Sequence, residues 1–207
     1  MKNIIILALS LIIITVSILF IYSYGFNPKP KVKNVLVIPL NDGVSESYTD
    51  SALTMLKHKF PNVNIIMGDK IKLPKSCFNG RRYRADSILK FLVKIKPDSI
   101  DHVIGLTSSD ISVTRTLIRN GKKKVYADRG IMGLGKKPGP VCVISSYRIP
   151  KIENFAKTTV HEFMHMLGVP HCTHKNCIMQ DGNGSGKNLR ESNHIHDSCY
   201  KIANMAF

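Results

Sequence analysis

Short apolar runs alternate with amphipathic helical patterns along most of the chain of 207 residues. Four runs rich in apolar and β-branched residues predict buried strands: 35–40, 63–67, 103–106 and 141–145. Segments 45–60 and 85–95 repeat apolar residues every three to four positions, which predicts helices that each bury one side. Alternating strands and helices of this kind predict an α/β layer.

The pattern is weaker between the third and fourth runs. Val125–Ala127 predicts only a weak strand, and Gly130–Pro140, with its four glycines, predicts a loop. The regular alternation resumes with the strand predicted at 141–145 and the helix that follows it.

The first 26 residues differ from the rest of the chain. Ile4–Tyr22 is nearly all apolar, and about 19 residues are enough to span a bilayer as a helix. A polar linker begins at Asn27, and Ser23-Tyr24-Gly25 offers a small-x-small pattern for a signal peptidase. We therefore expect a membrane anchor or uncleaved signal sequence at 1–26, with a cleaved signal as the alternative, and one domain at 27–207. The expected location is membrane-anchored or exported.

The charge balance is strongly basic, with 30 Lys and Arg against 14 Asp and Glu, a net charge of +16. Such a charge favours anionic partners, including acidic peptides, anionic lipid or cell wall. The densest runs are Arg81–Arg84 and Lys122–Lys124, and a solvated basic surface is the favoured interpretation of them. No nucleic-acid motif accompanies the charge, so we predict no specific nucleic-acid partner.

A third helix, expected to begin near Pro150, carries the candidate chemistry. At 100° per residue its apolar positions gather on one face, while two histidines lie on the opposite side with Glu162 at its edge. The predicted apolar face contains Ile152, Phe155, Ala156, Val160, Phe163 and Leu167. Gly168 permits a sharp exit from this helix.

The histidines of this helix have the spacing of zinc ligands. His161 and His165 stand one turn apart, and the chain that turns at Gly168 brings back His171 as a third ligand. Three protein ligands leave a fourth position for water, as a catalytic zinc requires. Glu162 is placed to act as general base and acid in the hydrolysis of an amide bond.

Cysteines and further histidines cluster near the C-terminus. Cys172, Cys177 and Cys199 fall within 40 residues of the end, with His196 three residues before the last of them. Paired Cys and His ligands separated by a loop are typical of a structural zinc site. Cys77 and Cys142 stand apart, and their pairing is left open.

From His161 to Met179 the sequence closely resembles the archaemetzincins, a family of metzincin zinc metallopeptidases with the pattern HExxHxxGxxHCx4CxMx17CxxC. The chain departs at the end of the pattern, where His196 replaces a cysteine and the spacer after Met179 has 16 residues. The resemblance implies a metzincin-like mixed, mostly parallel sheet, an active-site helix and a small zinc-bound C-terminal subdomain.

The resemblance also implies a ligand set for a second, structural zinc. It transfers directly to Cys172, Cys177 and Cys199, and to His196 as a hypothesis with three competitors: His174, His194 and Asp197. It further implies that Met179 forms a Met-turn below the catalytic zinc.

We therefore expect a monomeric domain with two Zn²⁺ ions that cleaves peptide or protein substrates. One alternative is a non-catalytic, zinc-stabilised basic domain that binds an anionic surface or polymer. Another is an amidase that acts on cell wall or small amides by the same chemistry.

Overall fold

The computed structural model describes residues 32–119, 122–182, 187–192 and 194–207. The leader predicted at 1–26, with its apolar segment 4–22, lies outside the described residues. No helix within the described residues is long and apolar enough to cross a membrane.

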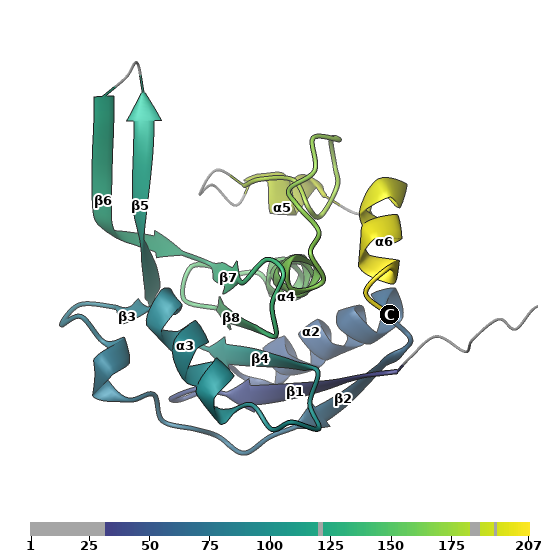
Figure 1. Ribbon diagram of the computed structural model, residues 1–207, viewed down its shortest axis with the longest axis horizontal. Coiled ribbons are helices and arrows are strands. Elements are labelled where there is room, and N and C mark those ends of the chain that lie inside the picture. The colour runs from purple at the N-terminus through teal and green to yellow at the C-terminus, as the bar shows by residue number, and fades with distance from the viewer. Residues whose placement is uncertain (1–31, 120–121, 183–186, 193) are drawn as a thin grey trace, which may run out of the picture. The chain divides into compact units, whose positions relative to one another are not determined.

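A five-stranded sheet forms the centre of the fold (Figure 1). Its strands, in spatial order, are β2 (Val63–Met67), β1 (Lys33–Pro39), β4 (His102–Thr107), β8 (Val141–Ser145) and β7 (Gly133–Gly135). The first four are parallel, and β7 pairs with β8 in the antiparallel direction at the edge. The predicted mixed, mostly parallel sheet is confirmed, and the four apolar runs form its four parallel strands.

Helices cover both faces of this sheet because neighbouring strand residues point to opposite sides. In β1, Val37 packs into the cluster that contains α2 (Glu46–Lys59) and α4 (Ile152–Met166), whereas Ile38 packs into the cluster around α3 (Ala85–Ile95). Figure 1 shows α2 and α4 on one side and α3 on the other. Burial of both faces explains why the central strands are continuous apolar runs.

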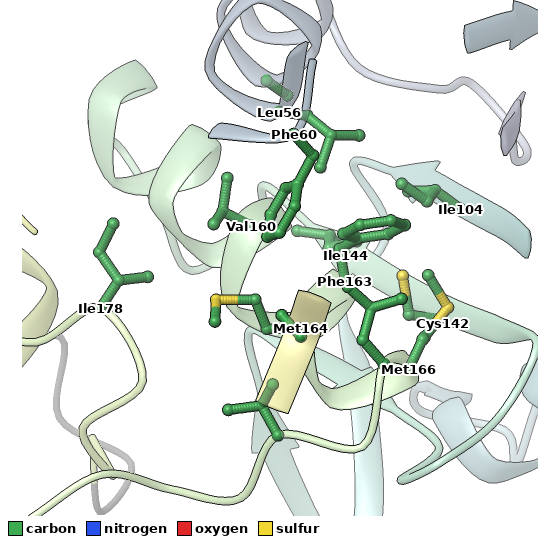
Figure 2. Close-up of a cluster of buried hydrophobic side chains, with 14 of the residues drawn as sticks. Leu56, Phe60, Ile104, Cys142, Ile144, Val160, Phe163, Met164, Met166 and Ile178 are labelled. Carbon is green, nitrogen blue, oxygen red and sulfur yellow. The ribbon is translucent and has the colours of Figure 1, made fainter. Parts of the chain in front are cut away.

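The apolar face of α4 anchors the helix in this core (Figure 2). Phe163 is fully buried, with its ring edge-on to Phe60 of α2 at a centroid distance of 5.2 Å. The other predicted face residues are also buried, except Ile152, which is 38% exposed. That prediction was wrong because Ile152 is the first residue of the helix, one turn before the buried Phe155 and Ala156.

A second, three-stranded sheet corrects the prediction for the middle of the chain. Its strands are β3 (Tyr83–Arg84), β5 (Ile111–Arg119) and β6 (Lys122–Ile131). Strands β5 and β6 form an antiparallel hairpin that extends well beyond the central sheet (Figure 1). The predicted strand at 125–127 is one part of β6, and the loop predicted at 130–140 contains the end of β6 and all of β7.

The remaining elements are short. A single 3₁₀ turn, η1 (Lys75–Cys77), precedes β3. Two short helices, α5 (Lys187–Glu191) and α6 (Asp197–Asn204), follow α4. Cys77 and Cys142 are both buried and free, so they do not pair with each other.

A half-buried histidine at the start of β4 is expected to make the core sensitive to acid. His102 packs edge-on against Phe163 at 5.6 Å, and its Nδ1 atom is buried without a hydrogen-bond partner among the described residues. Burial, followed by the nearby charge of Lys33, lowers its pKa to about 4; Asp101 and a bond to the Gly139 backbone oppose the shift.

We expect unfolding to become easier as the pH falls from about 6.5 to 4, because unfolded His102 takes up a proton in this range and folded His102 does not. The shift corresponds to a loss of up to roughly 3 kcal/mol. Replacing His102 with glutamine should flatten this part of the stability profile in urea unfolding at pH 7 and pH 4.5. His58→Gln, at an exposed position of α2, is the matched control. Equal pH slopes for wild type and His102→Gln would contradict the assignment.

Candidate metal centres

Three histidine side chains converge beside α4. His161 and His165 lie on successive turns of the helix, and Gly168, with φ of +89°, reverses the chain toward His171. The Nε2 atom of His165 is 3.1 Å from Nε2 of His161 and 3.2 Å from Nε2 of His171. Nitrogens bound to one tetrahedral zinc at 2.0–2.1 Å would be about 3.3 Å apart, so the triad fits a single zinc ion.

Two histidines of the triad are also held by a hydrogen bond at their other ring nitrogen, and the third faces a carboxylate there. Nδ1 of His161 is 2.8 Å from the Ile178 carbonyl oxygen, and Nδ1 of His165 is 2.7 Å from that of Val169. Nδ1 of His171 lies 3.6 Å from a carboxylate oxygen of Asp181. A proton on each Nδ1 satisfies these acceptors and leaves each Nε2 lone pair available to a metal.

Electrostatics keep the two helical imidazoles neutral. Burial, reinforced by the neighbouring His165, lowers the pKa of His161 to about 3. Burial likewise lowers the pKa of His165, although its bond to Val169 opposes the shift. Neutral imidazole is the form that binds zinc, so both groups are ready to act as ligands near neutral pH.

Glu162 is buried against the edge strand β7. Its side chain is 7% exposed, and the backbone of Gly135 hydrogen-bonds to it. Burial raises the pKa of Glu162 to about 8, and the Gly135 bond opposes this shift. A Cβ atom on Gly133 would lie 2.8 Å from the Glu162 carboxylate, and one on Gly135 would lie 2.6 Å from the Glu162 backbone oxygen. These two glycines therefore allow β7 to approach and hold the glutamate.

Met179 is fully buried directly after Ile178, whose carbonyl holds His161. Its backbone oxygen accepts a hydrogen bond of 2.8 Å from the Cys172 nitrogen, which links the segment after the triad to the cysteine cluster. The Met-turn remains a prediction from the sequence.

Three sulfur atoms meet in a second cluster. The Sγ atoms of Cys172, Cys177 and Cys199 all lie within 4.8 Å of one another. Burial opposes ionisation of Cys172, but hydrogen bonds from the His174 backbone and side chain and from the other thiols lower its pKa overall. The cluster thus favours a thiolate, the form of cysteine that binds zinc, at Cys172. Burial and the two neighbouring cysteines raise the pKa of Cys199 to about 12.

Two histidines border this cluster. Ligand atoms of Cys172, His174 and His196 form a further group within 4.8 Å. His174 Nδ1 is 3.3 Å from Cys172 Sγ, and the His174 ring stacks on the His196 ring at a centroid distance of 3.5 Å. Within the described residues, the other two competitors, His194 and Asp197, join neither group.

A cleft of about 320 Å³ lies beside the histidine triad. His161, Glu162 and His171 line it together with Asp181 and three arginines, namely Arg115, Arg129 and Arg148. Sequence analysis found the histidines and the glutamate but missed the arginines, Asp181 and the two glycines of β7. The basic composition was the one signal that pointed toward the arginines.

No protein-family model matches the chain. The chain is 27% identical over 157 residues to the archaemetzincin of Methanocaldococcus jannaschii, an alignment that covers 73% of this chain and 82% of the relative. It is 31% identical over 118 residues to the archaemetzincin of Methanopyrus kandleri, covering 53% of this chain and 60% of the relative.

Solved structures resemble the fold described above. The crystal structure of the Methanopyrus kandleri archaemetzincin superposes with a TM-score of 0.69 at 22% identity, covering 87% of this chain and 98% of that chain. A zinc-dependent peptidase from Methanocorpusculum labreanum superposes with a TM-score of 0.56 at 17% identity, covering 82% and 99%. At these identities the structures establish similarity of fold.

A helix packed against a mostly parallel sheet carries two of the three converging imidazoles and the buried glutamate, and the third imidazole follows the helix. These are features of the zinc metallopeptidase class. Among proteins of that class, the chain is similar in sequence and in fold to archaemetzincins.

Proposed function

We propose that the chain is a zinc-dependent metallopeptidase that hydrolyses peptide bonds in peptide or protein substrates. His161, His165 and His171 hold the catalytic zinc, and Glu162 is the catalytic base. The observation that carries this proposal is the convergence of three Nε2 atoms whose partner Nδ1 atoms all face acceptors. The similarity to archaemetzincins supports the same class of enzyme.

A zinc ion bound by the triad would polarise the substrate carbonyl and acidify a coordinated water. Glu162 performs the proton transfers. It lies beside His161, the bond from Gly135 orients it, and its burial excludes bulk water from the carboxylate. The positive charge of a zinc ion in the triad would oppose the effect of burial on the pKa of Glu162 and favour the ionised carboxylate. The carboxylate would then accept the proton of the attacking water and deliver it to the nitrogen of the departing amine.

We also assign a second, structural zinc to Cys172, Cys177, Cys199 and His196. Three cysteines and one histidine form an accepted closed zinc site. This site would join the segment after His171 to the N-terminal turn of α6, which makes a small zinc-bound C-terminal subdomain. The proposed unit of activity is the monomer.

The first test of this assignment is the metal content. We expect two zinc ions per chain, one of which leaves readily to a chelator because three protein ligands hold it less tightly than a closed set of four. His161→Ala should retain one zinc that resists the chelator, and mild chelation of wild type should give the same state. A stoichiometry of one, lost in a single step, would disprove the two-site assignment.

Two other functions remain as alternatives. A non-catalytic basic domain that binds an anionic surface or polymer would account for the charge but would leave the buried, backbone-held Glu162 without a purpose. An amidase that acts on cell wall or small amides would use the same triad and glutamate. The kind of substrate cleaved, a peptide chain or a small or cell-wall amide, therefore distinguishes the peptidase from the amidase. Any turnover at all distinguishes both enzymes from the binding domain.

The decisive experiment incubates the zinc-loaded full chain, kept in mild detergent, with a diverse peptide library and with cell-wall fragments. We expect cleavage of internal peptide bonds that the Glu162→Ala variant does not catalyse. Cleavage of cell-wall amides alone would favour the amidase. Absence of turnover on both sets would leave the binding domain as the better account.

The location also remains a proposal. The apolar segment 4–22 is long enough to anchor the domain in a membrane, and the domain would then act at the membrane or outside the cytoplasm. We expect the expressed chain to sediment with membranes and to resist extraction by carbonate. A chain that stays in the soluble fraction without loss of residues 1–26 would argue against an anchor.

A further inference from the structure

The wall of the catalytic cleft carries three arginines from two separate parts of the chain. Arg115 lies on β5, Arg129 lies on β6, and Arg148 follows β8. All three line the same cleft of about 320 Å³ as His161 and Glu162.

Arg148 is fixed in place by a shared carboxylate. Its Nε and Nη2 atoms are 3.0 and 2.8 Å from the two oxygens of Asp110, which also accepts a hydrogen bond of 2.6 Å from Arg82. A Cβ atom at Gly130 would overlap the Arg148 guanidinium, so β6 has room for it only because this residue is glycine. Arg82 also pairs with Asp128 at 2.9 Å, which continues the network. In this network four arginines share three carboxylates, so the positive charge exceeds the negative charge by one: Arg81, Arg82, Arg84 and Arg148 with Asp86, Asp110 and Asp128.

Arg115 and Arg129 are brought to the cleft by the hairpin. The pairing of β5 with β6 shifts register between Val113 and Arg115, and Val113 is the residue that pairs with Arg129. Such an irregularity bends a strand and redirects its side chains. Arg115 is half-buried and makes no ion pair with any of the described residues.

Two carboxylates line the cleft together with the three arginines. Glu162 is reserved for proton transfer in the proposed function, and Asp181 faces Nδ1 of His171 at 3.6 Å. A guanidinium group is planar and binds a carboxylate through two parallel hydrogen bonds. A concave site lined by charge of one sign also concentrates ligands of the opposite sign.

We propose that the cleft selects acidic peptides: substrates in which the carboxylate of an Asp or Glu side chain, close to the scissile bond, binds at Arg115 and its neighbours Arg129 and Arg148. This inference rests on the proposed peptidase function and specifies its substrate class. In this proposal the arginines of the cleft bind substrate carboxylates, whereas a solvated basic surface would bind no particular ligand.

Binding can be measured without turnover. The zinc-loaded full chain carrying Glu162→Ala is titrated with fluorescent peptides that differ only by Glu or Gln at single positions near the cleavage site. We expect the best Glu peptide to bind about tenfold more tightly than its Gln partner at low salt, and we expect this ratio to shrink as salt is added. A ratio near one at every position would overturn the inference.

Variants of Arg115 then locate the selectivity. Adding Arg115→Gln should bring the Glu/Gln ratio close to one, and Arg115→Lys should restore part of it. Lys94→Gln makes the same change of charge on the exposed surface of α3 and should leave the ratio intact. An equal fall in the ratio for Arg115→Gln and Lys94→Gln would show a general charge effect and would reject the site.

Two further binding measurements test whether the cleft recognises a different anionic group, either the terminal carboxylate of a peptide or a phosphate. Peptides with free and amidated C-termini test a terminal carboxylate, and inorganic phosphate serves as a competitor. Tight binding that requires the free terminus, or that phosphate abolishes at low concentration, would reject the side-chain carboxylate as the feature recognised.

The same peptides are finally tested with the enzyme that retains Glu162. Equal cleavage of Glu and Gln peptides would refute the acidic preference and leave the peptidase function intact. Selective binding without any cleavage would instead refute the peptidase function.

Discussion

Replacing Glu162 with alanine is expected to lower kcat/KM for peptide cleavage by about 10²–10⁴-fold, the usual contribution of a general acid–base group. Zinc content and the temperature of unfolding should stay close to wild type, because the carboxylate is not among the three groups that converge on the metal position. Activity is measured on a peptide taken from the library experiment, and zinc by elemental analysis of the same protein sample.

The expected loss follows from how the glutamate is held. Burial and the Gly135 backbone restrict it to one position next to His161, and no other glutamate lines the cleft. The other carboxylate that lines the cleft, Asp181, faces Nδ1 of His171 at 3.6 Å, on the side of the ring away from Nε2, so it is not placed to take over the role of Glu162.

Two control variants separate catalysis from metal binding. His161→Ala should lose both activity and the catalytic zinc, whereas Glu46→Ala, at an exposed position in the first turn of α2, should change neither. Wild-type turnover by Glu162→Ala would disprove the assigned role, and loss of zinc from this variant would make Glu162 a ligand.

The helix that carries the triad could be predicted because its signals are local. A helical repeat fixes the relation between His161 and His165 within five residues, and Gly168 marks the exit from the helix. The same is true of the parallel strands, whose burial on both faces produces continuous apolar runs. In both cases the feature of the fold, a helical repeat or burial on both faces, leaves its pattern within a few neighbouring residues of the sequence.

The β5–β6 hairpin was missed although its signals are present in the sequence. Apolar residues alternate with polar ones from Ile111 to Val113 and again at Leu117, and Asn120-Gly121, a dipeptide typical of two-residue hairpin turns, stands between the two strands. The charged residues of β6 obscured the alternation. Consequently the arginines of the hairpin could not be connected with the cleft.

The supports of the glutamate could not be predicted from local pattern at all. Gly133 and Gly135 precede Glu162 by more than 25 residues, and they reach it because the edge strand β7 pairs with β8, which packs under α4. In the sequence these glycines are typical of a loop. Their role depends on the tertiary contact between two elements, which no short window of sequence contains.

The second large effect is expected at the cysteine cluster. Cys177→Ser should release the structural zinc and unfold the C-terminal segment, because the free energy of structural zinc binding, about 10–16 kcal/mol in small zinc domains, is coupled to folding. His196→Ala should release the same zinc, with a smaller loss of stability. His196→Cys should retain the metal, because it restores the cysteine of the archaemetzincin pattern.

The contacts of the two bordering histidines give them different roles. Nδ1 of His196 accepts a hydrogen bond of 3.3 Å from the Ser198 backbone nitrogen and lies 2.8 Å from the Ser198 hydroxyl oxygen, so in this structure it caps α6 as an acceptor. His174 Nδ1 faces Cys172 Sγ at 3.3 Å, a position from which an N–H group stabilises the thiolate. We expect His196 to complete the site because the archaemetzincin pattern has a cysteine at this position; Nδ1 would then give up its capping bond and carry the proton while Nε2 binds zinc. We expect His174 to orient the site.

The comparison uses zinc retention against a chelator of graded strength and melting temperature for four variants. Ser198→Ala and His174→Ala should weaken zinc binding by about 10–100-fold, the usual effect of groups that orient ligands, whereas His196→Ala should abolish tight binding. His194→Ala should behave as wild type, since its backbone oxygen, which accepts a bond of 2.8 Å from Ile178, is unaffected. If His174→Ala abolishes tight binding and His196→Ala does not, the fourth ligand is His174, and His196 serves to cap α6 through its bond with Ser198.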